Sequence, residues 1–342
     1  MFKKYAVIAI FAFFLISIAS CGKKDENTDI NKTDTSKISQ IIKKDSVTGK
    51  DKVLFKYTGK PGDKLFYKLV AKISDTQNNP ETKGQDLKND NESIFYYWKE
   101  VESVDDKGVI TFSIKIDSII EKQSLGEQSI TYNSNVYDTV RSSQGSMFYN
   151  ALIYQPFKIR QSPDGKVTDI FALENVYDNL FKILGDTIDE KQKEGIKSSL
   201  SMQSVKDFLQ SELQIFSKDY IQVDSSWQFS QDGQVFYFNI KNNIKYILKS
   251  IDNVNGQYIA NIDGIASTDF LEKEVKDKSG TARIDESNSS GTGTVKINLS
   301  RGCVQTKETT INVYIAYTIS SGGQSAKVKR NVTQNFSVTL LN

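Results

Sequence analysis

Histidine is absent from this chain of 342 residues, and cysteine and proline are scarce, at two and four residues. Without histidine there can be no Ser–His or Cys–His pair for nucleophilic catalysis, and the side chain most used as a general base is missing. Two cysteines cannot hold a disulfide scaffold together, and they leave zinc without its usual ligands. The composition therefore excludes several common enzyme classes, and we expect no metal and no cofactor.

Neither sign of charge dominates, with 44 basic and 42 acidic residues and a formal net charge of +2. A nucleic-acid-binding protein needs a basic face that displaces the counterions of the phosphates, so we expect no nucleic-acid partner. The hydrophobic fraction of 38% over this length is ample for a core, which excludes a disordered chain. After residue 20 no apolar run is long enough to span a membrane.

Residues 1–20 are typical of a signal peptide. Lys3 and Lys4 form a positive start, and the apolar run 5–18 is short for a membrane-spanning helix. The run ends in Ile18-Ala19-Ser20-Cys21, which resembles the lipobox of bacterial lipoproteins. That resemblance implies cleavage before Cys21, diacylation of its thiol and acylation of the new amine. We therefore expect the protein to be attached to a membrane through acyl chains on Cys21.

The residues after the lipobox indicate a location. In the lipoprotein family an aspartate at the position of Gly22 signals retention at the inner membrane, so the glycine favours the outer membrane. The run Lys23-Lys24-Asp25-Glu26 is similar to a signal that sends some lipoproteins to the cell surface. We expect a lipoprotein of the cell envelope in the outer membrane, on either its periplasmic face or the cell surface.

The rest of the chain divides into a tether and a body. Residues 21–52 contain the lipidated cysteine and a polar segment with almost no aromatic residues, which cannot bury enough apolar area to fold and is predicted to be a flexible tether. Residues 53–342 are predicted to be a single antiparallel α+β domain. No linker rich in glycine or proline divides it.

Alternation of apolar and polar residues predicts strands with one buried face over most of the body. Polar loops are expected at 75–91 and 276–290, and turns at 252–256, 300–302 and in the hairpin 162–165. The predicted strands cover 65–73, 94–104, 110–117, 128–132, 157–161, 166–171, 235–240, 243–251, 257–265, 294–299, 310–319 and 328–340.

A helical block at about 172–217 interrupts the strands. Apolar residues at helical spacing predict three helices, with Gly185 ending the first one. The segment from Thr187 to Glu190 resembles a capping box that opens the second. The expected fold class is α+β, with a large curved antiparallel sheet, half-barrel-like and of two lobes, and a central helical insert packing on it.

A search for chemical motifs identifies no catalytic residue. The run Gly291-Thr292-Gly293 begins like a dinucleotide-binding loop but lacks the third glycine and leads into a strand, so a turn is expected there. Cys303 begins a strand and is expected to be a buried, inert thiol. It is expected to form no intramolecular disulfide, because its only possible partner, Cys21, is acylated in this interpretation. Carboxylates are abundant, but nothing singles out a pair.

The aromatic run 95–98 has two interpretations. A strand buried on both faces explains it, with the helical block as cover, and so does a sheet that lines an apolar cavity. The terminal strands offer further apolar residues at 311, 313, 315 and 317. The candidate pocket residues are Phe95, Tyr97, Trp98, Phe112, Ile114, Leu180, Phe181 and Tyr317.

The order of these features resembles a family of bacterial lipoproteins of unknown function, from about residue 55 onwards. The resemblance rests on turn-like segments at 62–69, 157–167, 223–227 and 290–293, and it transfers no catalytic residue. More distantly, the plan is similar to the curved sheet with covering helices of periplasmic lipoprotein carriers, which implies an apolar pocket for lipid.

The sequence therefore favours a lipid-anchored, non-enzymatic envelope protein that binds an apolar ligand or a protein partner. One alternative is a structural or surface-interaction lipoprotein without a small ligand. Another is a carboxylate-based hydrolase of envelope glycans, which needs two acids about 5–10 Å apart.

Overall fold

The structure is a computed structural model that describes residues 40–78, 85–137, 146–185, 188–199, 202–277 and 280–342. The predicted signal peptide, Cys21 and the first part of the predicted tether lie outside these residues. The strands are β1 (Ile42–Lys44), β2 (Asp51–Val53), β3 (Lys64–Asn78), β4 (Leu87–Val104), β5 (Ile110–Leu125), β6 (Gln128–Asn133), β7 (Phe157–Gln161), β8 (Val167–Phe171), β9 (Ile221–Gln222), β10 (Ser226–Val235), β11 (Phe238–Val254), β12 (Gln257–Phe270), β13 (Glu274–Asp277), β14 (Gly280–Asn298), β15 (Cys303–Ser321) and β16 (Gln324–Leu340). The helices are α2 (Met147–Leu152), α3 (Glu174–Leu184), α4 (Glu190–Ser199) and α5 (Met202–Glu212).

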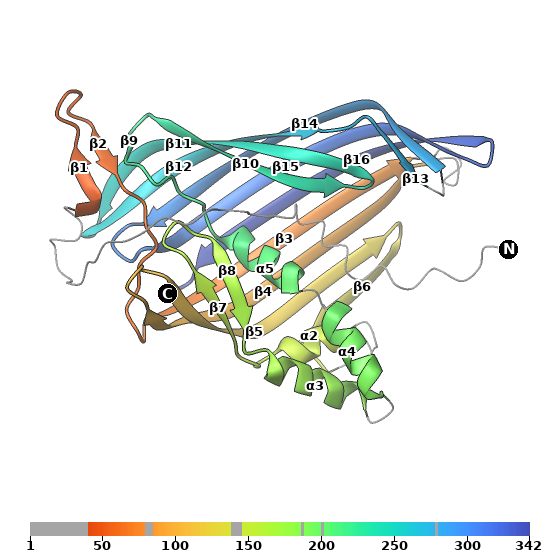
Figure 1. Ribbon diagram of the computed structural model, residues 1–342, viewed down its shortest axis with the longest axis horizontal. Helices are drawn as coiled ribbons and strands as arrows, with labels where there is room; N and C mark the ends of the chain where they lie inside the picture. Colours follow the sequence, from red (N-terminus) through yellow and green to blue (C-terminus); the bar gives the residue numbers. More distant parts are fainter. Residues whose placement is uncertain (1–39, 79–84, 138–145, 186–187, 200–201, 278–279) are drawn as a thin grey trace.

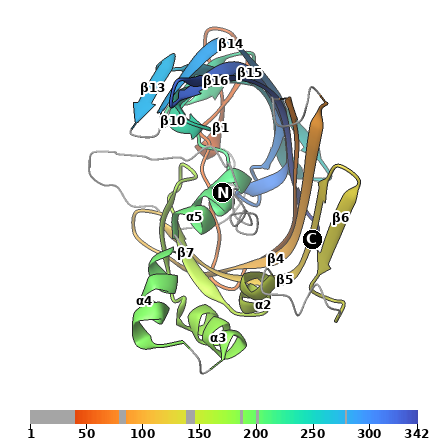
Figure 2. The same cartoon turned by 90° about the vertical axis from the view of Figure 1, so that its right-hand side faces the viewer.

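One antiparallel sheet of 13 strands dominates the fold (Figure 1). Its order is β10-β11-β12-β14-β15-β16-β3-β4-β5-β7-β8, with β13 beside β14 and β6 beside β5. The N-terminal and C-terminal halves join where β16 pairs with β3, and the sheet ends at β10 and β8 without closing. Figure 2 shows the sheet curling into a half-barrel. These findings confirm the predicted α+β class and its large curved antiparallel sheet.

The helical insert packs on the sheet, as predicted. Helix α5 lies on the concave side of the curl, and α3 and α4 gather beyond β5 and β7 (Figure 2). Beside them lies α2, which precedes the predicted helical block and was not expected. Gly185 caps α3 at φ 79°, a conformation that favours glycine. Within the described ranges, no helix is both long and apolar enough to cross a membrane.

The hydrophobic core has two parts on the concave face. The first core cluster lies under α5 and includes Leu69, Tyr97, Ile119, Leu209 and Val304. The second core cluster lies at the other end of the C-terminal strands and consists of Phe238, Ala282, Ile284, Ile315, Tyr317 and Val328. Because β11, β14, β15 and β16 contribute to both clusters, their long spans connect the two ends of the half-barrel.

The strands are longer than the sequence predicts. The segment expected to be a loop at 276–290 lies mostly in β14, and the loop expected at 75–91 is narrowed by β3, which runs to Asn78, and β4, which begins at Leu87. Glycine and serine normally favour loops, but β15 pairs with β14 along its whole length and satisfies its backbone groups. Tertiary pairing therefore overrides the local preference of these residues.

The body also begins earlier than expected. Strands β1 and β2 lie within residues assigned to the tether or at its end. They form a second sheet of three strands, in which β2 pairs with β1 on one side and with β9 on the other. Val53 is fully buried in the first core cluster, which gives this segment an apolar anchor.

The second helix of the insert has a different cap from the one predicted. The capping box is made by Asp189 and Gln192, whose side chains each accept a hydrogen bond from the backbone N–H of the other residue, at 2.8 and 2.9 Å. Thr187, the expected cap, lies outside the described residues. The third helix ends at Glu212, so Leu213 and Phe216 pack in the core from the segment that follows it.

Candidate functional site

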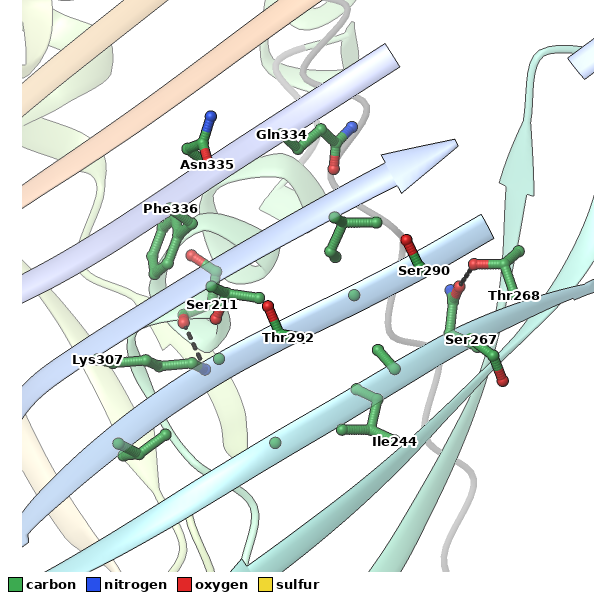
Figure 3. Close-up of a pocket in the computed structure, with 18 of the residues that line it drawn as sticks. Ser211, Ile244, Ser267, Thr268, Ser290, Thr292, Lys307, Gln334, Asn335 and Phe336 are labelled. Atoms are coloured by element: carbon green, nitrogen blue, oxygen red, sulfur yellow. Dashed lines mark hydrogen bonds between the residues drawn. The ribbon is translucent and has the colours of Figure 1, made fainter. Parts of the chain in front are cut away.

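An inner cavity of about 210 Å³ lies on the concave face between the two core clusters (Figure 3). On β15 the lining residues Lys307, Thr309 and Ile311 follow Val304 of the first core cluster and precede Ile315 of the second. The cavity is lined from β3 by Ala71, Lys72 and Ile73, from α5 and the segment after it by Ser211 and Gln214, from β10 and β11 by Gln231, Asn242, Ile244 and Tyr246, from β12 by Gly264, Ala266, Ser267 and Thr268, from β14 by Ser290, Gly291, Thr292, Gly293 and Val295, from β15 by the three residues above, and from β16 by Gln334, Asn335 and Phe336.

The cavity exists because small residues meet across neighbouring strands. Gly264 of β12 is paired with Gly293 of β14, and Ala266 is paired with Gly291. A Cβ atom at Gly293 would lie 2.6 Å from the carbonyl oxygen of Glu308, so no side chain fits there. With these side chains missing, the sheet presents bare backbone to the interior.

The walls of the cavity are largely apolar. Ile244, Val295, Ile311 and Phe336 contribute aliphatic and aromatic surface. Among the described residues that line it there is no aspartate or glutamate, so the carboxylate pair that a glycan hydrolase needs is not found in this part of the cavity wall. A cavity of this kind suits an apolar ligand with few polar groups.

A buried ion pair holds α5 against the sheet at one end of the cavity. Nζ of Lys99 lies 2.8 Å from Oε1 of Glu212, and the two side chains are only 3% and 1% exposed. The hydroxyl of Tyr97 donates to the other oxygen of Glu212 at 2.7 Å. On the edge strand, the Gln210 amide accepts from the backbone of Val167 at 2.8 Å. These contacts fix the last turn of α5, which forms part of the cavity wall.

Lys307 reaches across the same end of the cavity. Its Nζ donates to the carbonyl oxygens of Ser211 and Leu213 at 2.9 and 2.7 Å, at the C-terminus of α5 (Figure 3 shows the first of these). The unpaired carbonyls of a helix C-terminus attract a cation. Burial lowers the pKa of Lys307 to about 8, and nearby Glu212 opposes this shift.

Polar groups in the cavity wall include two that lack a partner. The Thr268 hydroxyl donates to Oδ1 of Asn242 at 2.7 Å, while Nδ2 of Asn242 has no acceptor in the described structure. Gln214 donates from Nε2 to the carbonyl of Ile215 at 3.0 Å, while its Oε1 has no donor. Asn242 is 5% exposed and Gln214 is 1% exposed. A buried polar group without a partner costs about 1–3 kcal/mol, so these atoms call for an explanation.

Aromatic side chains and an ion pair gather at the second core cluster, outside the residues that line the cavity. Phe236, at the tip of the β10–β11 hairpin, has a φ of 55°, a conformation that is rare for a bulky residue. Its ring lies 3.8 Å from Cζ of Arg330, which is paired with Asp75. The same hairpin places Tyr237 and Phe238 against Tyr317. The hairpin tip therefore packs on the second core cluster.

The eight predicted pocket residues do not all come together, and none of them is among the lining residues of the inner cavity. Phe95, Tyr97, Phe112, Ile114 and Leu180 are buried in the first core cluster, where the ring of Phe95 lies 4.6 Å from that of Phe208 in α5.

The other three predicted pocket residues lie elsewhere. Trp98 stacks on Phe66 at 4.5 Å on the other face of β4, Phe181 stacks on Tyr177 in α3 at 6.4 Å, and Tyr317 belongs to the second core cluster. The binding role predicted for all eight residues stays a prediction.

Two titratable groups are buried away from the cavity. Cys303 is 3% exposed, as expected, and burial raises the pKa of its thiol to about 11. Glu121 on β5 is 3% exposed, and neither of its oxygens has a hydrogen-bond partner at close range. Burial raises the pKa of this carboxyl group to about 7, and the neighbouring Ser93 side chain is the strongest influence in the opposite direction.

Sequence reasoning missed most of the cavity, although a signal was present. Gly291 and Gly293 were expected in a turn, but both lie within β14. Glycines two residues apart in a strand share a face, so this spacing marks a bare patch once the segment is known to be a strand. Ile311, which the sequence offered as a further apolar residue, does line the cavity.

Solved structures with a similar arrangement are remote. A structure of lipid–protein interactions in lipovitellin is 11% identical, with a TM-score of 0.43, and the alignment covers 83% of this chain and 25% of that one. OpdL of Pseudomonas aeruginosa is 8% identical, with a TM-score of 0.21, covering 82% of this chain and 99% of the other. The present chain thus spans about a quarter of the lipovitellin chain, and similarity of this order carries no conclusion about function.

No curated protein matches the sequence. The sequence profile of a family described as a family of unknown function, DUF6263, matches residues 107–304, which is more than half of the chain. This finding agrees with the expected membership in an uncharacterised family. The chain therefore belongs to the DUF6263 family, whose function is unknown.

Proposed function

We propose that this protein is a lipid-anchored, non-enzymatic protein of the cell envelope that binds an apolar ligand in the inner cavity of its half-barrel. The observation that carries the proposal is the hollow itself. Gly264, Ala266, Gly291 and Gly293 leave the concave face bare where the same strands are packed solid on either side.

The apolar lining of the hollow supports a binding role. Ile244, Ile311 and Phe336 line the cavity, and a ligand that covers them removes apolar surface from water, at about 25 cal/mol per Å². A ligand that binds only the folded chain also stabilises it, by an amount that grows with the logarithm of the ligand concentration.

The anchor in this proposal rests on the lipobox-like segment that ends in Cys21. Two or three acyl chains hold a protein firmly, at about 0.8 kcal/mol per buried methylene. Cells grown with an alkyne-tagged fatty acid should incorporate the tag into the wild-type chain and not into Cys21→Ser. Equal labelling of the two chains would refute the anchor and leave the cavity argument intact.

Photo-crosslinking tests the cavity in the full chain. Membranes that contain the protein are irradiated with a hydrocarbon probe carrying a diazirine and an alkyne, and the labelled peptides are mapped by mass spectrometry. We expect labels on the lining segments of β12, β14 and β15. Ala266→Leu adds three carbons beside Gly291, since a Cβ at Gly291 would already lie 2.9 Å from that of Ala266. This change should reduce the labelling of the lining several-fold.

The matched control is Thr294→Leu. Thr294 lies on β14 one residue beyond Gly293, is exposed, and does not line the cavity. The Thr294→Leu substitution places a leucine on the opposite face of the same strand and should leave the labelling of the cavity lining unchanged. Absence of label from the lining of the wild-type chain, or equal loss in both variants, would overturn the proposed function.

A further inference from the structure

We propose that the ligand of the inner cavity is a neutral amphiphile whose carbonyl group, from an ester or an amide, accepts a hydrogen bond from Asn242. This inference rests on the proposed function and narrows its ligand class. It starts from one atom, because Nδ2 of Asn242 is a buried donor in the cavity wall with no acceptor. The side chain is 95% buried, with 5% exposed.

The surroundings of Asn242 show why its free group is the donor. Its Oδ1 already accepts the hydroxyl of Thr268 at 2.7 Å. Thr268 is itself fixed by Ser289, whose hydroxyl accepts from the Thr268 backbone N–H at 2.7 Å and donates to the Thr268 carbonyl at 3.2 Å. The amide is thus held by β12 through its oxygen, and its NH₂ group is left for an acceptor that the described protein does not supply.

The charges around the cavity favour a neutral acceptor. Among the described lining residues, Lys307 and Lys72 are the cations. Lys72 is paired with Glu92 at 2.6 Å, and Lys307 lies at the other end of the bare strip from Asn242, where it donates to two carbonyl oxygens. A carboxylate or phosphate at Asn242 would therefore lose its hydration without a counter-charge beside it, whereas a carbonyl needs one donor.

The size of the cavity sets the length of the apolar part. At roughly 30 Å³ for each water-sized group, about 210 Å³ holds about seven such groups. The bare strip formed by Gly264, Gly291 and Gly293 extends from the Asn242 end of the cavity towards Lys307. A chain of seven or eight carbons, or the end of a longer one, fits along this strip with its carbonyl at Asn242.

The experiment compares three photo-crosslinking probes of equal length on the full chain in membranes. They are a fatty acid methyl ester, the corresponding free acid and a hydrocarbon, each with a diazirine and an alkyne. For each probe, the labelling of the Ala266→Leu variant is subtracted from that of the wild-type chain. In this variant the cavity is filled, so the remaining labelling reports the partition of the probe into the membrane. The measured quantity is the concentration that gives half-maximal labelling of the cavity lining.

We expect the ester to label the wild-type chain at a concentration about threefold to tenfold lower than the hydrocarbon, as one hydrogen bond supplies. Asn242→Leu, which keeps the number and branching of the side-chain heavy atoms and removes the donor, should abolish this difference. The control is Asn243→Leu, because Asn243 bonds Ser230 and Asp269 and does not line the cavity. It should preserve the preference for the ester.

The outcomes separate the two proposals. The carbonyl inference is wrong if the hydrocarbon labels the wild-type lining as well as the ester does, or if the free acid labels it best. In both cases the cavity still binds apolar ligands, and the proposed function stands. If no probe labels the lining, the proposed function fails. Should Asn242→Leu not fold, the comparison of ester and hydrocarbon on the wild-type chain decides the question alone.

Discussion

The buried ion pair between Lys99 and Glu212 makes a quantitative prediction about how α5 is held. The two groups are 2.8 Å apart and almost completely buried, and Glu212 also accepts from Tyr97. Lys99→Met keeps the aliphatic stem and removes the charge, which leaves a carboxylate buried without its cation. Removing one partner of such a pair costs about 3–5 kcal/mol. At about 2 °C per kcal/mol for a chain of this length, the melting temperature should fall by about 6–10 °C.

Urea unfolding followed by tryptophan fluorescence measures this loss, and a double variant tests its cause. Lys99→Met combined with Glu212→Met removes both charges and should recover most of the stability, because no unpaired charge then remains. The control is Lys64→Met, since Lys64 pairs with Glu100 at 3.2 Å on the exposed surface, with 58% and 45% exposure. It should cost less than about 1 kcal/mol. A loss at Lys99 no greater than at Lys64, or additive losses in the double variant, would refute the reasoning.

Three further predictions concern single residues. Gly165→Ala should destabilise the protein by more than about 2 kcal/mol, because φ is 94° and a Cβ would lie 2.4 Å from the Gln214 carbonyl oxygen. The control Gly62→Ala, where φ is 89° and the surrounding space is open, should cost about 1 kcal/mol. Urea unfolding measures both losses. Cys303, with its pKa raised to about 11, should react with iodoacetamide at pH 8 at least about 100-fold more slowly in the folded chain than in urea, measured in Cys21→Ser. Glu121 should make the folded state less stable as the pH rises from about 4.5 to about 7, by on the order of 3 kcal/mol, and Glu121→Gln should remove this dependence.

The sign of the Glu121 effect follows from proton binding. The folded carboxyl group, with a pKa of about 7, keeps its proton over a range in which the unfolded one has lost it. Stability falls with rising pH wherever the folded state binds more protons, so it is greatest below the unfolded pKa. Equal pH profiles of unfolding for the wild type and Glu121→Gln would contradict the assignment. Equal losses of stability in Gly165→Ala and Gly62→Ala would contradict the Gly165 prediction. Rapid reaction of Cys303 with iodoacetamide in the folded chain would contradict the Cys303 prediction.

The inner cavity and the anchored helix belong to one arrangement. Glu212 ends α5, and the residues just before and just after it, Ser211 and Leu213, receive Lys307 at the cavity wall. Loosening α5 should therefore open the cavity at this end as well as lower stability. The Lys99→Met variant links the two, because it disturbs the helix without changing a lining residue.

Local patterns in the sequence determined much of the secondary structure. Period-two alternation marked most of the strands, although the predicted strand 235–240 spans the tip of the β10–β11 hairpin. Asn255 and Gly256 formed a tight turn within the expected segment at φ values of 52° and 80°, and Gly185 ended α3. These features depend on the backbone preferences of a few adjacent residues, so they can be recognised without knowing the fold. The same patterns also identified the class of fold, a large antiparallel sheet with a helical insert.

Only the tertiary structure decided where the cavity lies. Gly264 and Gly293 meet because β12 pairs with β14 in one particular register, and a shift of one residue would turn their faces outwards. Lys99 finds Glu212 across 113 positions of sequence. Composition and spacing do not predict such long-range contacts, because these contacts depend on which strand and helix faces are buried together over the whole chain. The sequence by itself therefore determined the class of fold and many of its elements, and the packing of the half-barrel decided how far the strands extend and which residues form a site.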